Sequence, residues 1–140
     1  MKVEIRNESI RIWQERWNNS ENGRLTWEYF SNIEERLKRK EVKFTKHMLQ
    51  VITGHGEFPA YKRRFGFADS ATCWCGEQGT VEHRLTNCPM GHREREELKI
   101  ALRAEGHDWP PAKHVLVCEK FLPLFRELCE AICGVEEEQA

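Results

Sequence analysis

The amino-acid sequence predicts a mainly α-helical fold, with one small domain of five or six helices around an embedded Cys/His segment. Two observations lead to this prediction. Apolar residues recur at helical spacing along most of the 140 residues, whereas residues 70–92 are rich in Cys, His and Gly and have no lasting apolar period. The apolar fraction is 39% and the charged fraction 32%, so the core is thin and would gain from a staple.

The first two helices are expected at residues 9–17 and 27–40. Ile10, Trp13 and Trp17 share one face of the first helix, and the run NNSENG that ends at Gly23 stops it. The second helix ends in the basic run RLKRK, which suits the negative end of a helix dipole. Its inward-facing residues are Trp27, Phe30, Ile33 and Leu37.

A third helix is expected at residues 45–53. Thr45 suits the N-cap position, and Gly54 suits the residue that follows a helix C-terminus. The segment TGHGEFP is then expected to turn into the short aromatic and basic stretch AYKRRFGF. The apolar stripe of this helix comprises Phe44, Met48, Val51 and Ile52.

Helical periodicity returns after the Cys/His segment, at residues 93–104 and 111–133. Gly106 and the pair Pro110-Pro111 separate the two regions, and Pro123 kinks the second region or divides it in two. The side chains expected to be mostly buried across the whole fold are Trp13, Trp17, Phe44, Ile52, Leu98, Leu102, Phe125 and Leu128.

Residues 1–140 are expected to form a single domain, because no linker, repeat or low-complexity block divides them. Its parts are a basic helical half (1–69), the Cys/His segment (70–92), C-terminal helices (93–133) and a frayed acidic tail (134–140). Residues 1–75 carry 14 Lys or Arg against 10 Asp or Glu, and the remainder carries 8 against 13. A surface for a polyanion is therefore expected in the first half, and the alternative is an ordinary solvated helix face.

The spacing Cys-x-Cys-x7-His-x4-Cys at Cys73, Cys75, His83 and Cys88 predicts one structural zinc site. Three thiolates and one imidazole satisfy tetrahedral zinc, and Gly76 allows the tight turn after the second Cys. The gap of one residue between the first two Cys is shorter than usual. The alternative interpretations are a pair of buried thiols beside an unrelated His, or a set in which His92 replaces one ligand.

The other chemistry in the chain is limited. Four protein ligands leave no open position on a zinc ion for water or substrate, and the order of ligands differs from that of the zinc deaminases. Asp69 and Asp108 are the only two aspartates, too few for a two-metal nuclease or polymerase site. We therefore expect no enzyme activity. Small buried side chains are expected at Cys118, Cys129 and Cys133 rather than a second metal site.

The N-terminal residues are charged throughout, and no apolar run reaches the length of a membrane-spanning helix. These features predict an intracellular protein, nuclear or cytoplasmic. In either compartment, six cysteines favour metal ligands and thiols over disulfides.

Four stretches in this order resemble one known protein region: WQERWNNSENGRLTWEYF, ITGHGEFPAYKRRFG, DSATCWCGEQGTVEHRLTNCP and a charged helix that begins HRERE. The sequence is similar, over residues 13–132, to the C-terminal segment of non-LTR retrotransposon polyproteins. The likeness is to insect elements of the Jockey group and to those that insert into ribosomal genes. The resemblance implies a Cys-Cys-His-Cys zinc motif with the four ligands named above. It also implies a parent RNA-directed DNA polymerase with an endonuclease, whose catalytic residues this chain lacks, and an excised or domesticated fragment.

Two functions are expected from these observations. In the family that the sequence resembles, this segment is thought to hold template RNA or target DNA near the polymerase. Cations beside aromatic rings, the combination that grips single strands, occur at Tyr61, Lys62, Arg63 and Arg64, and Trp74 offers a ring for base stacking or a cover over the metal. The alternative is a zinc-stabilised module for protein interaction or self-association, which suits the acidic second half and the apolar last helix.

Overall fold

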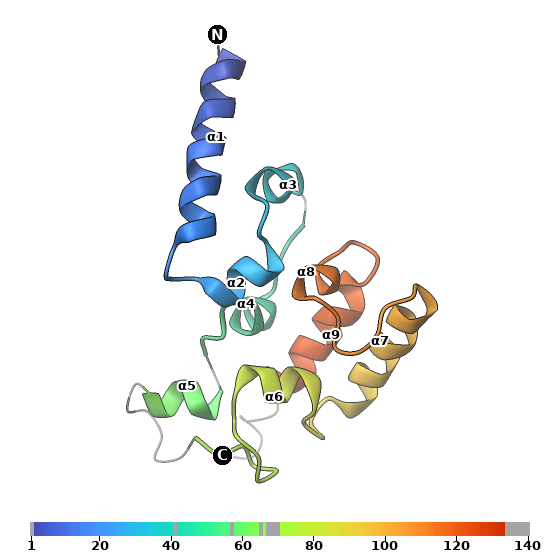
Figure 1. Ribbon diagram of the computed structural model, residues 1–140. Coiled ribbons are helices and arrows are strands. Elements are labelled where there is room, and N and C mark those ends of the chain that lie inside the picture. Colours follow the sequence, from blue (N-terminus) through green and yellow to red (C-terminus); the bar gives the residue numbers. More distant parts are fainter. Residues whose placement is uncertain (1, 41, 57, 65, 67–70, 134–140) are drawn as a thin grey trace.

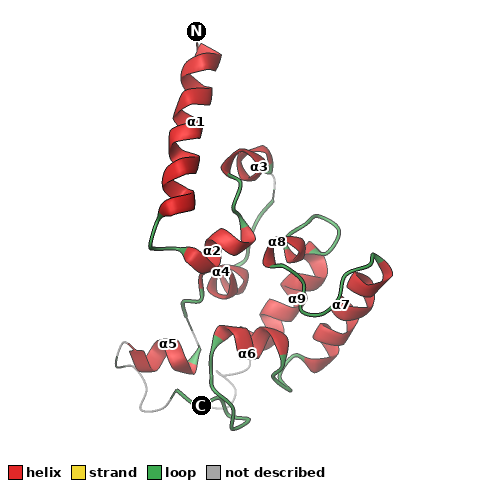
Figure 2. Ribbon diagram, viewed as in Figure 1, coloured by secondary structure: helices red, strands yellow, loops and turns green. Residues whose placement is uncertain are grey.

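The computed structural model describes residues 2–40, 42–56, 58–64, 66 and 71–133, and this part of the chain is mainly helical (Figures 1 and 2). No β-strand occurs in these residues; one isolated bridge pairs Thr72 with Gln78. The mainly α fold class is confirmed, but the described helices number nine rather than five or six. They are α1 Lys2–Asn19, α2 Arg24–Tyr29, α3 Ile33–Lys38, α4 Lys46–Thr53, α5 Pro59–Arg64, α6 Val81–Thr86, α7 His92–Ala104, α8 Lys113–Leu116 and α9 Leu122–Cys133.

The core forms around α9, which packs mainly against α4 and α7 and lies between them in Figure 1. α9 carries an apolar stripe at helical spacing, so one face of the helix is removed from water along its whole length. Residues of α9 that are buried in the core are Phe125, Leu128, Cys129, Ile132 and Cys133. The acidic tail expected at residues 134–140 lies outside the described residues.

The first helix was expected to bury its tryptophans, and this prediction is wrong for Trp13, which is 53% exposed. α1 has no buried residue and projects away from the rest of the chain (Figure 1). Trp17 is half-buried, and its Nε1–H donates to the carbonyl oxygen of Phe30 at 2.7 Å. Only the edge of the helix that rests on α2 and α3 is partly covered, so apolar side chains elsewhere on the helix stay exposed. Phe44 is also half-buried, whereas the prediction of burial is confirmed for Ile52, Leu98, Leu102, Phe125 and Leu128.

The expected second helix is divided into α2 and α3, because a side chain from α1 binds the backbone at the break. The Gln14 amide donates to the carbonyl of Ser31 at 2.6 Å, and its oxygen accepts from the N–H of Ile33 at 2.9 Å. Asn32 then starts α3 by accepting the N–H of Glu35. A long-range contact therefore overrides a continuous helical pattern.

The boundaries of α4 and α7 agree with the sequence. Thr45 caps α4 by accepting the N–H of Met48 at 3.2 Å, and Gly54 ends the helix with φ of 75°. The last helical region is divided, as one of the two readings of Pro123 allowed. The break lies at residues 117–121, and Pro123 occupies the first turn of α9, where its missing N–H costs no hydrogen bond. No described helix is both long and apolar enough to cross a membrane.

The central place of α9 gives a test of the core. Leu128→Ala should destabilise the protein by about 2–5 kcal/mol, because it leaves a cavity among fully buried neighbours. Leu49→Ala on α4 is the matched control, since Leu49 is 48% exposed and surface changes usually stay within about 0.5 kcal/mol. Urea unfolding followed by circular dichroism measures both. Equal losses in the two variants would contradict this packing.

Candidate metal centre

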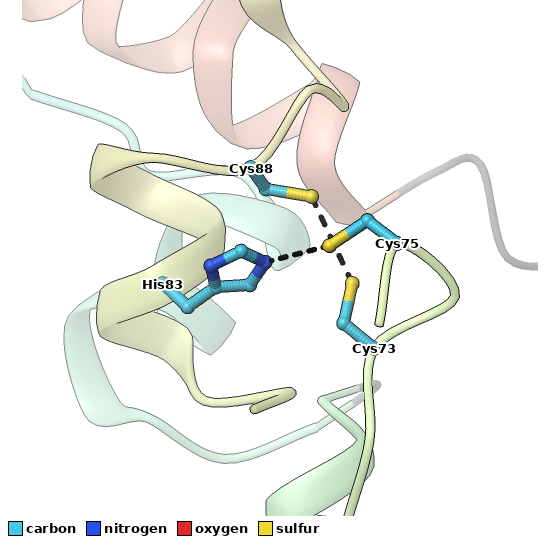
Figure 3. A group of neighbouring side chains, drawn as sticks. All are labelled: Cys73, Cys75, His83 and Cys88. Atoms are coloured by element: carbon cyan, nitrogen blue, oxygen red, sulfur yellow. Dashed lines mark hydrogen bonds between the residues drawn. The ribbon is translucent and has the colours of Figure 1, made fainter. Parts of the chain in front are cut away.

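The structure brings the four side chains of the predicted metal set together (Figure 3). The Sγ atoms of Cys73, Cys75 and Cys88 and a ring nitrogen of His83 all lie within 4.8 Å of one another. Cys73 Sγ and Cys88 Sγ are 3.7 Å apart, and Cys75 Sγ is 3.1 Å from His83 Nε2. Two thiolates on a tetrahedral zinc ion stand roughly 3.8 Å apart, given Zn–S bonds of about 2.3 Å. The cluster therefore fits a divalent metal of zinc's size and softness.

The first two ligands sit on a tight turn that its own backbone closes. The N–H of Cys73 donates to the carbonyl of Glu77 at 2.7 Å, and the N–H of Gly76 donates to Cys73 at 2.9 Å. Gly76 has φ of 96°, a conformation that side chains with a Cβ rarely adopt. The N–H of Cys75 also donates to the sulfur of Cys73. This turn brings two sulfurs to one site although a single residue separates them.

The other two ligands are joined through one carbonyl group. Thr80 caps α6 by accepting the N–H of His83 at 3.1 Å, which places the imidazole in the first turn. The carbonyl of His83 accepts from the N–H groups of Asn87 and Cys88, at 2.8 and 2.9 Å. The x4 spacing between His83 and Cys88 is therefore the length of one helical turn and its C-terminal closure.

A buried arginine from α7 fixes the backbone that carries Cys88. Arg95 is only 2% exposed. Its guanidinium group donates to four carbonyl oxygens at 2.5–3.1 Å, which belong to Arg84, Leu85, Cys88 and Met90. These carbonyls lie at the end of α6 and in the turn beyond it, where helix geometry leaves them without partners. Arg95 thus orients the last ligand from a helix that contributes no ligand.

A second buried arginine lies beside the sulfurs. Arg84 is fully buried, and its side chain donates to the sulfur of Cys73. Burial raises the pKa of the Cys73 thiol, but hydrogen bonds from the N–H of Cys75 and from Arg84 bring it below its ordinary value. The deprotonated form, which is the form that binds metals, is therefore reached more easily at Cys73 than at an ordinary thiol.

Burial shifts the pKa values of Cys88 and His83 so that the neutral form of each is favoured. Burial raises the pKa of the Cys88 thiol to about 12, with the neighbouring Cys73 adding to the effect. Burial lowers the pKa of His83, so its imidazole is neutral at pH 7 and has a lone pair for a metal. A divalent ion would displace the proton of Cys88 and complete a set of three thiolates and one imidazole.

The alternative ligands do not join this cluster. His92 is exposed at the start of α7 and is not a member of the four-residue group. Cys129 and Cys133 are buried in the core, as expected, whereas Cys118 is exposed, so its predicted burial is wrong. Cys118 lies after α8 in the turn before α9, outside the apolar stripe.

The residues proposed for nucleic-acid contact lie next to the Cys/His segment. The stretch expected to follow a turn forms α5, whose Ala60 N–H donates to the carbonyl of Gly79 at 3.0 Å. A Cβ on Gly79 would lie 2.5 Å from Pro59, so α5 packs directly on the segment. Tyr61 is half-buried and stacks on His55, with ring centroids 5.0 Å apart. The side chain of Lys62 is half-buried, Arg63 and Arg64 are exposed, and Trp74 between two ligands is 53% exposed.

Sequence reasoning missed the two buried arginines. Arg84 and Arg95 stand among other charged residues, and such residues normally face solvent. The helix that carries Arg84, α6, is too short to show a period, so nothing in the sequence marks this residue as buried. Arg95 precedes Leu98 by three residues and Leu102 by seven on α7, so helical periodicity places it on the buried face, and this signal could have found it.

The role of Arg95 can be tested with two matched variants of α7. Arg95→Met should destabilise the protein by about 3 kcal/mol or more, because it leaves buried carbonyls without donors. Arg103→Met, at an exposed position of the same helix, should change stability little. Chemical unfolding measures both, and metal content after purification should fall only in the first. Indistinguishable variants would show that the four carbonyl contacts do not hold the Cys88 turn.

Comparison with known proteins supports the resemblance seen in the sequence. The chain is 34% identical over 117 residues to "Retrovirus-related Pol polyprotein from type-1 retrotransposable element R1 4" of Nasonia vitripennis. The match covers 82% of this chain and 29% of that protein. The R1 2 polyprotein of the same wasp is 30% identical over 68% of this chain and 24% of its own length. An R1 polyprotein of Bradysia coprophila is 32% identical over 56% of this chain and 8% of its own.

The chain therefore spans less than a third of the length of each of these relatives. No family model matches the sequence, and no solved structure is similar. The chain is homologous, over most of its length, to the Pol polyproteins of R1 retrotransposons.

Proposed function

We propose that the chain is a zinc-stapled nucleic-acid-binding module of a retrotransposon polyprotein, with RNA or single-stranded DNA as its ligand. The observation that carries this proposal is the position of α5. This basic helix packs on the Cys/His segment through the contact between Ala60 and Gly79, and the same segment carries the exposed ring of Trp74. A cationic surface beside an accessible aromatic ring suits a strand that offers phosphates and bases together.

Zinc is the metal that we propose for the Cys-Cys-His-Cys set. Soft thiolates with one imidazole favour zinc among the common divalent ions, and the distance between Cys73 Sγ and Cys88 Sγ suits its tetrahedral geometry. Four protein ligands close the coordination sphere, so the ion would serve the fold and leave no position for a substrate. We accordingly propose no enzymatic activity for this chain and an intracellular site of action, nuclear or cytoplasmic.

Among the residues proposed for nucleic-acid contact, we assign the main stacking role to Trp74. The ring is more than half exposed, although both flanking residues are metal-ligand candidates. A tryptophan that covered the metal would be mostly buried, so stacking on a base is the better explanation of its position. Tyr61 already stacks on His55, and we assign it a supporting role next to Lys62 in the chain.

A protein-interaction or self-association module is the second candidate, and α1 is the observation that favours it. Large apolar side chains are exposed along this helix, which contributes no buried residue. Exposed apolar surface of this extent often marks an interface. The residues concerned are Val3, Ile5, Ile12 and Trp13. Sedimentation over a range of protein concentrations tests self-association directly.

The zinc proposal predicts one zinc ion per chain. Elemental analysis of protein purified without added metal measures the stoichiometry. Cys88→Ser should lower the thermal midpoint and the zinc content, because metal binding contributes to folding free energy. Cys118→Ser is the matched control, since Cys118 lies on the surface outside the cluster, and it should alter neither. A folded, monodisperse and metal-free wild-type protein would overturn the proposal.

The nucleic-acid proposal predicts weak, salt-dependent binding. We expect micromolar or weaker affinity for a mixed-sequence single-stranded oligonucleotide. With about three phosphate contacts, at roughly 0.7 per contact, the log–log salt slope should be about −2. Fluorescence anisotropy at several salt concentrations measures it.

Two pairs of variants locate the surface. Replacing Lys62, Arg63 and Arg64 together with Ala should flatten the salt slope, whereas replacing three exposed arginines outside this surface should not. That control set is Arg93, Arg103 and Arg126. Trp74→Ala should weaken binding more than Trp13→Ala, which removes an equally exposed ring. If the wild-type protein binds no oligonucleotide at low salt, the nucleic-acid proposal fails and the interaction module becomes the better function.

A further inference from the structure

A cavity of about 240 Å³ opens between α3 and α8. These two helices lie on the far side of α2 from α5 (Figure 1). The C-terminal end of α2, the loop at Ser31 and the face of α3 form one side, and α8 with the turn after it forms the other. The two sides are joined where α2 packs against α8. The polar and charged side chains that line it include Asn32, Glu35, Arg36, Arg39, His114 and Cys118.

Arg39 carries the feature that needs an explanation. Its Nε and Nη2 atoms are buried and have no hydrogen-bond partner in the described part of the chain. A guanidinium group stays protonated at any physiological pH. Burial of its N–H groups without acceptors is unfavourable. Neither a carboxylate nor a carbonyl of the described residues relieves this, so an acceptor from outside the fold would complete the site.

Arg36 supplies a second cation that is already held in place. Its guanidinium group lies over the rings of Phe30 and Phe44, with centroid distances of 5.4 and 5.2 Å. Its Nη1 donates to the carbonyl of Arg39 at 3.4 Å. The two rings meet edge to face, so contact with both of them and the bond to the Arg39 carbonyl hold the guanidinium group in place. A ligand would therefore meet a donor that loses little freedom on binding.

The balance of charge in the cavity favours an anion with more than one oxygen. Arg36 and Arg39 face a single carboxylate, that of Glu35, and no ion pair joins it to either arginine among the described residues. Asn32 uses its side-chain oxygen to accept from the N–H of Glu35, which leaves its amide N–H groups for a ligand. Two guanidinium groups and an amide match the tetrahedral oxygens of a phosphate better than the two oxygens of a carboxylate.

We propose that this cavity is a binding site for a phosphate group, with Arg39 as its main donor and Arg36 as the preorganised second. The site is independent of the α5 surface and does not rest on nucleic-acid binding there. A free phosphate, a mononucleotide and a phosphate of a strand present the same chemistry to the two arginines.

Cys118 provides a probe of this cavity in the wild-type protein. It is exposed, lines the cavity, and can be alkylated with iodoacetamide and followed by mass spectrometry. Inorganic phosphate should slow this alkylation relative to chloride at equal ionic strength and pH. A bound anion both occupies the cavity and disfavours the reactive thiolate. No protection by phosphate in the wild-type protein would overturn the proposal without any variant.

Two charge-neutralising variants supply the matched comparison. Arg39→Gln should weaken phosphate protection by about tenfold or more, because it removes charge-assisted hydrogen bonds, while Arg103→Gln at an exposed site should retain it. The thermal midpoint of Arg39→Gln without phosphate should equal or exceed that of the wild type, since two buried guanidinium nitrogens without acceptors are lost. Full protection in Arg39→Gln, or a lower midpoint that phosphate does not affect, would assign Arg39 a structural role instead.

Three ligands in the same assay distinguish the possible sources of the phosphate group. They are inorganic phosphate, a mononucleotide and an oligonucleotide without terminal phosphate. Protection by inorganic phosphate and by a mononucleotide alone identifies a site for a free phosphate group. Additional protection by an oligonucleotide without terminal phosphate places a strand's backbone in the cavity. Because the first arm uses no nucleic acid, its failure would leave the α5 proposal standing, and failure of oligonucleotide binding at α5 would leave this site standing.

Discussion

The guanidinium group of Arg95 is the contact on which the arrangement of the metal cluster depends. It joins α7, which is packed on the central helix α9, to four carbonyl oxygens between Arg84 and Met90. The Cys/His segment has a very small apolar cluster of its own, formed by Cys73, Cys88 and Met90. Such a cluster cannot offset the chain entropy of the segment. The segment is therefore ordered from two directions, by the clamp of Arg95 and by its own four converging ligands.

The sequence was sufficient to predict those structures that depend on interactions between residues close together in the chain. Thr45 and Gly54 defined both ends of α4, and the periodic residues Leu98 and Leu102 identified the buried face of α7. The convergence of the four cluster residues could also be predicted from their spacing, because a turn at Gly76 and one turn of helix after His83 are local structures. These are the cases in which sequence pattern and tertiary environment favour the same conformation.

Contacts between residues far apart in the sequence explain where the structure differs from the predictions. The break between α2 and α3 depends on Gln14, which lies 17 residues from the carbonyl that it binds. The exposure of Trp13 follows from how little of α1 rests on other elements, and helical periodicity alone cannot show whether an apolar face has a partner. Helices α5 and α6 have six residues each, too few for a period to be recognised. In each case the deciding interaction lies outside the window that a pattern covers.

Two fully buried arginines lie beside the three cysteines of the cluster. Arg84 and Arg95 are at most 2% exposed, and cations are seldom buried unless anionic groups lie near them. With a divalent ion, three thiolates and a neutral imidazole carry one net negative charge, and a single thiolate without the ion carries the same charge. The net charge of the cluster therefore does not by itself account for the buried arginines. Their hydrogen bonds do, because Arg84 donates to the sulfur of Cys73 and Arg95 donates to four carbonyl oxygens, that of Cys88 among them. These acceptors, on and beside the ligands, are a physical reason for the arginines to lie where solvent cannot compensate them.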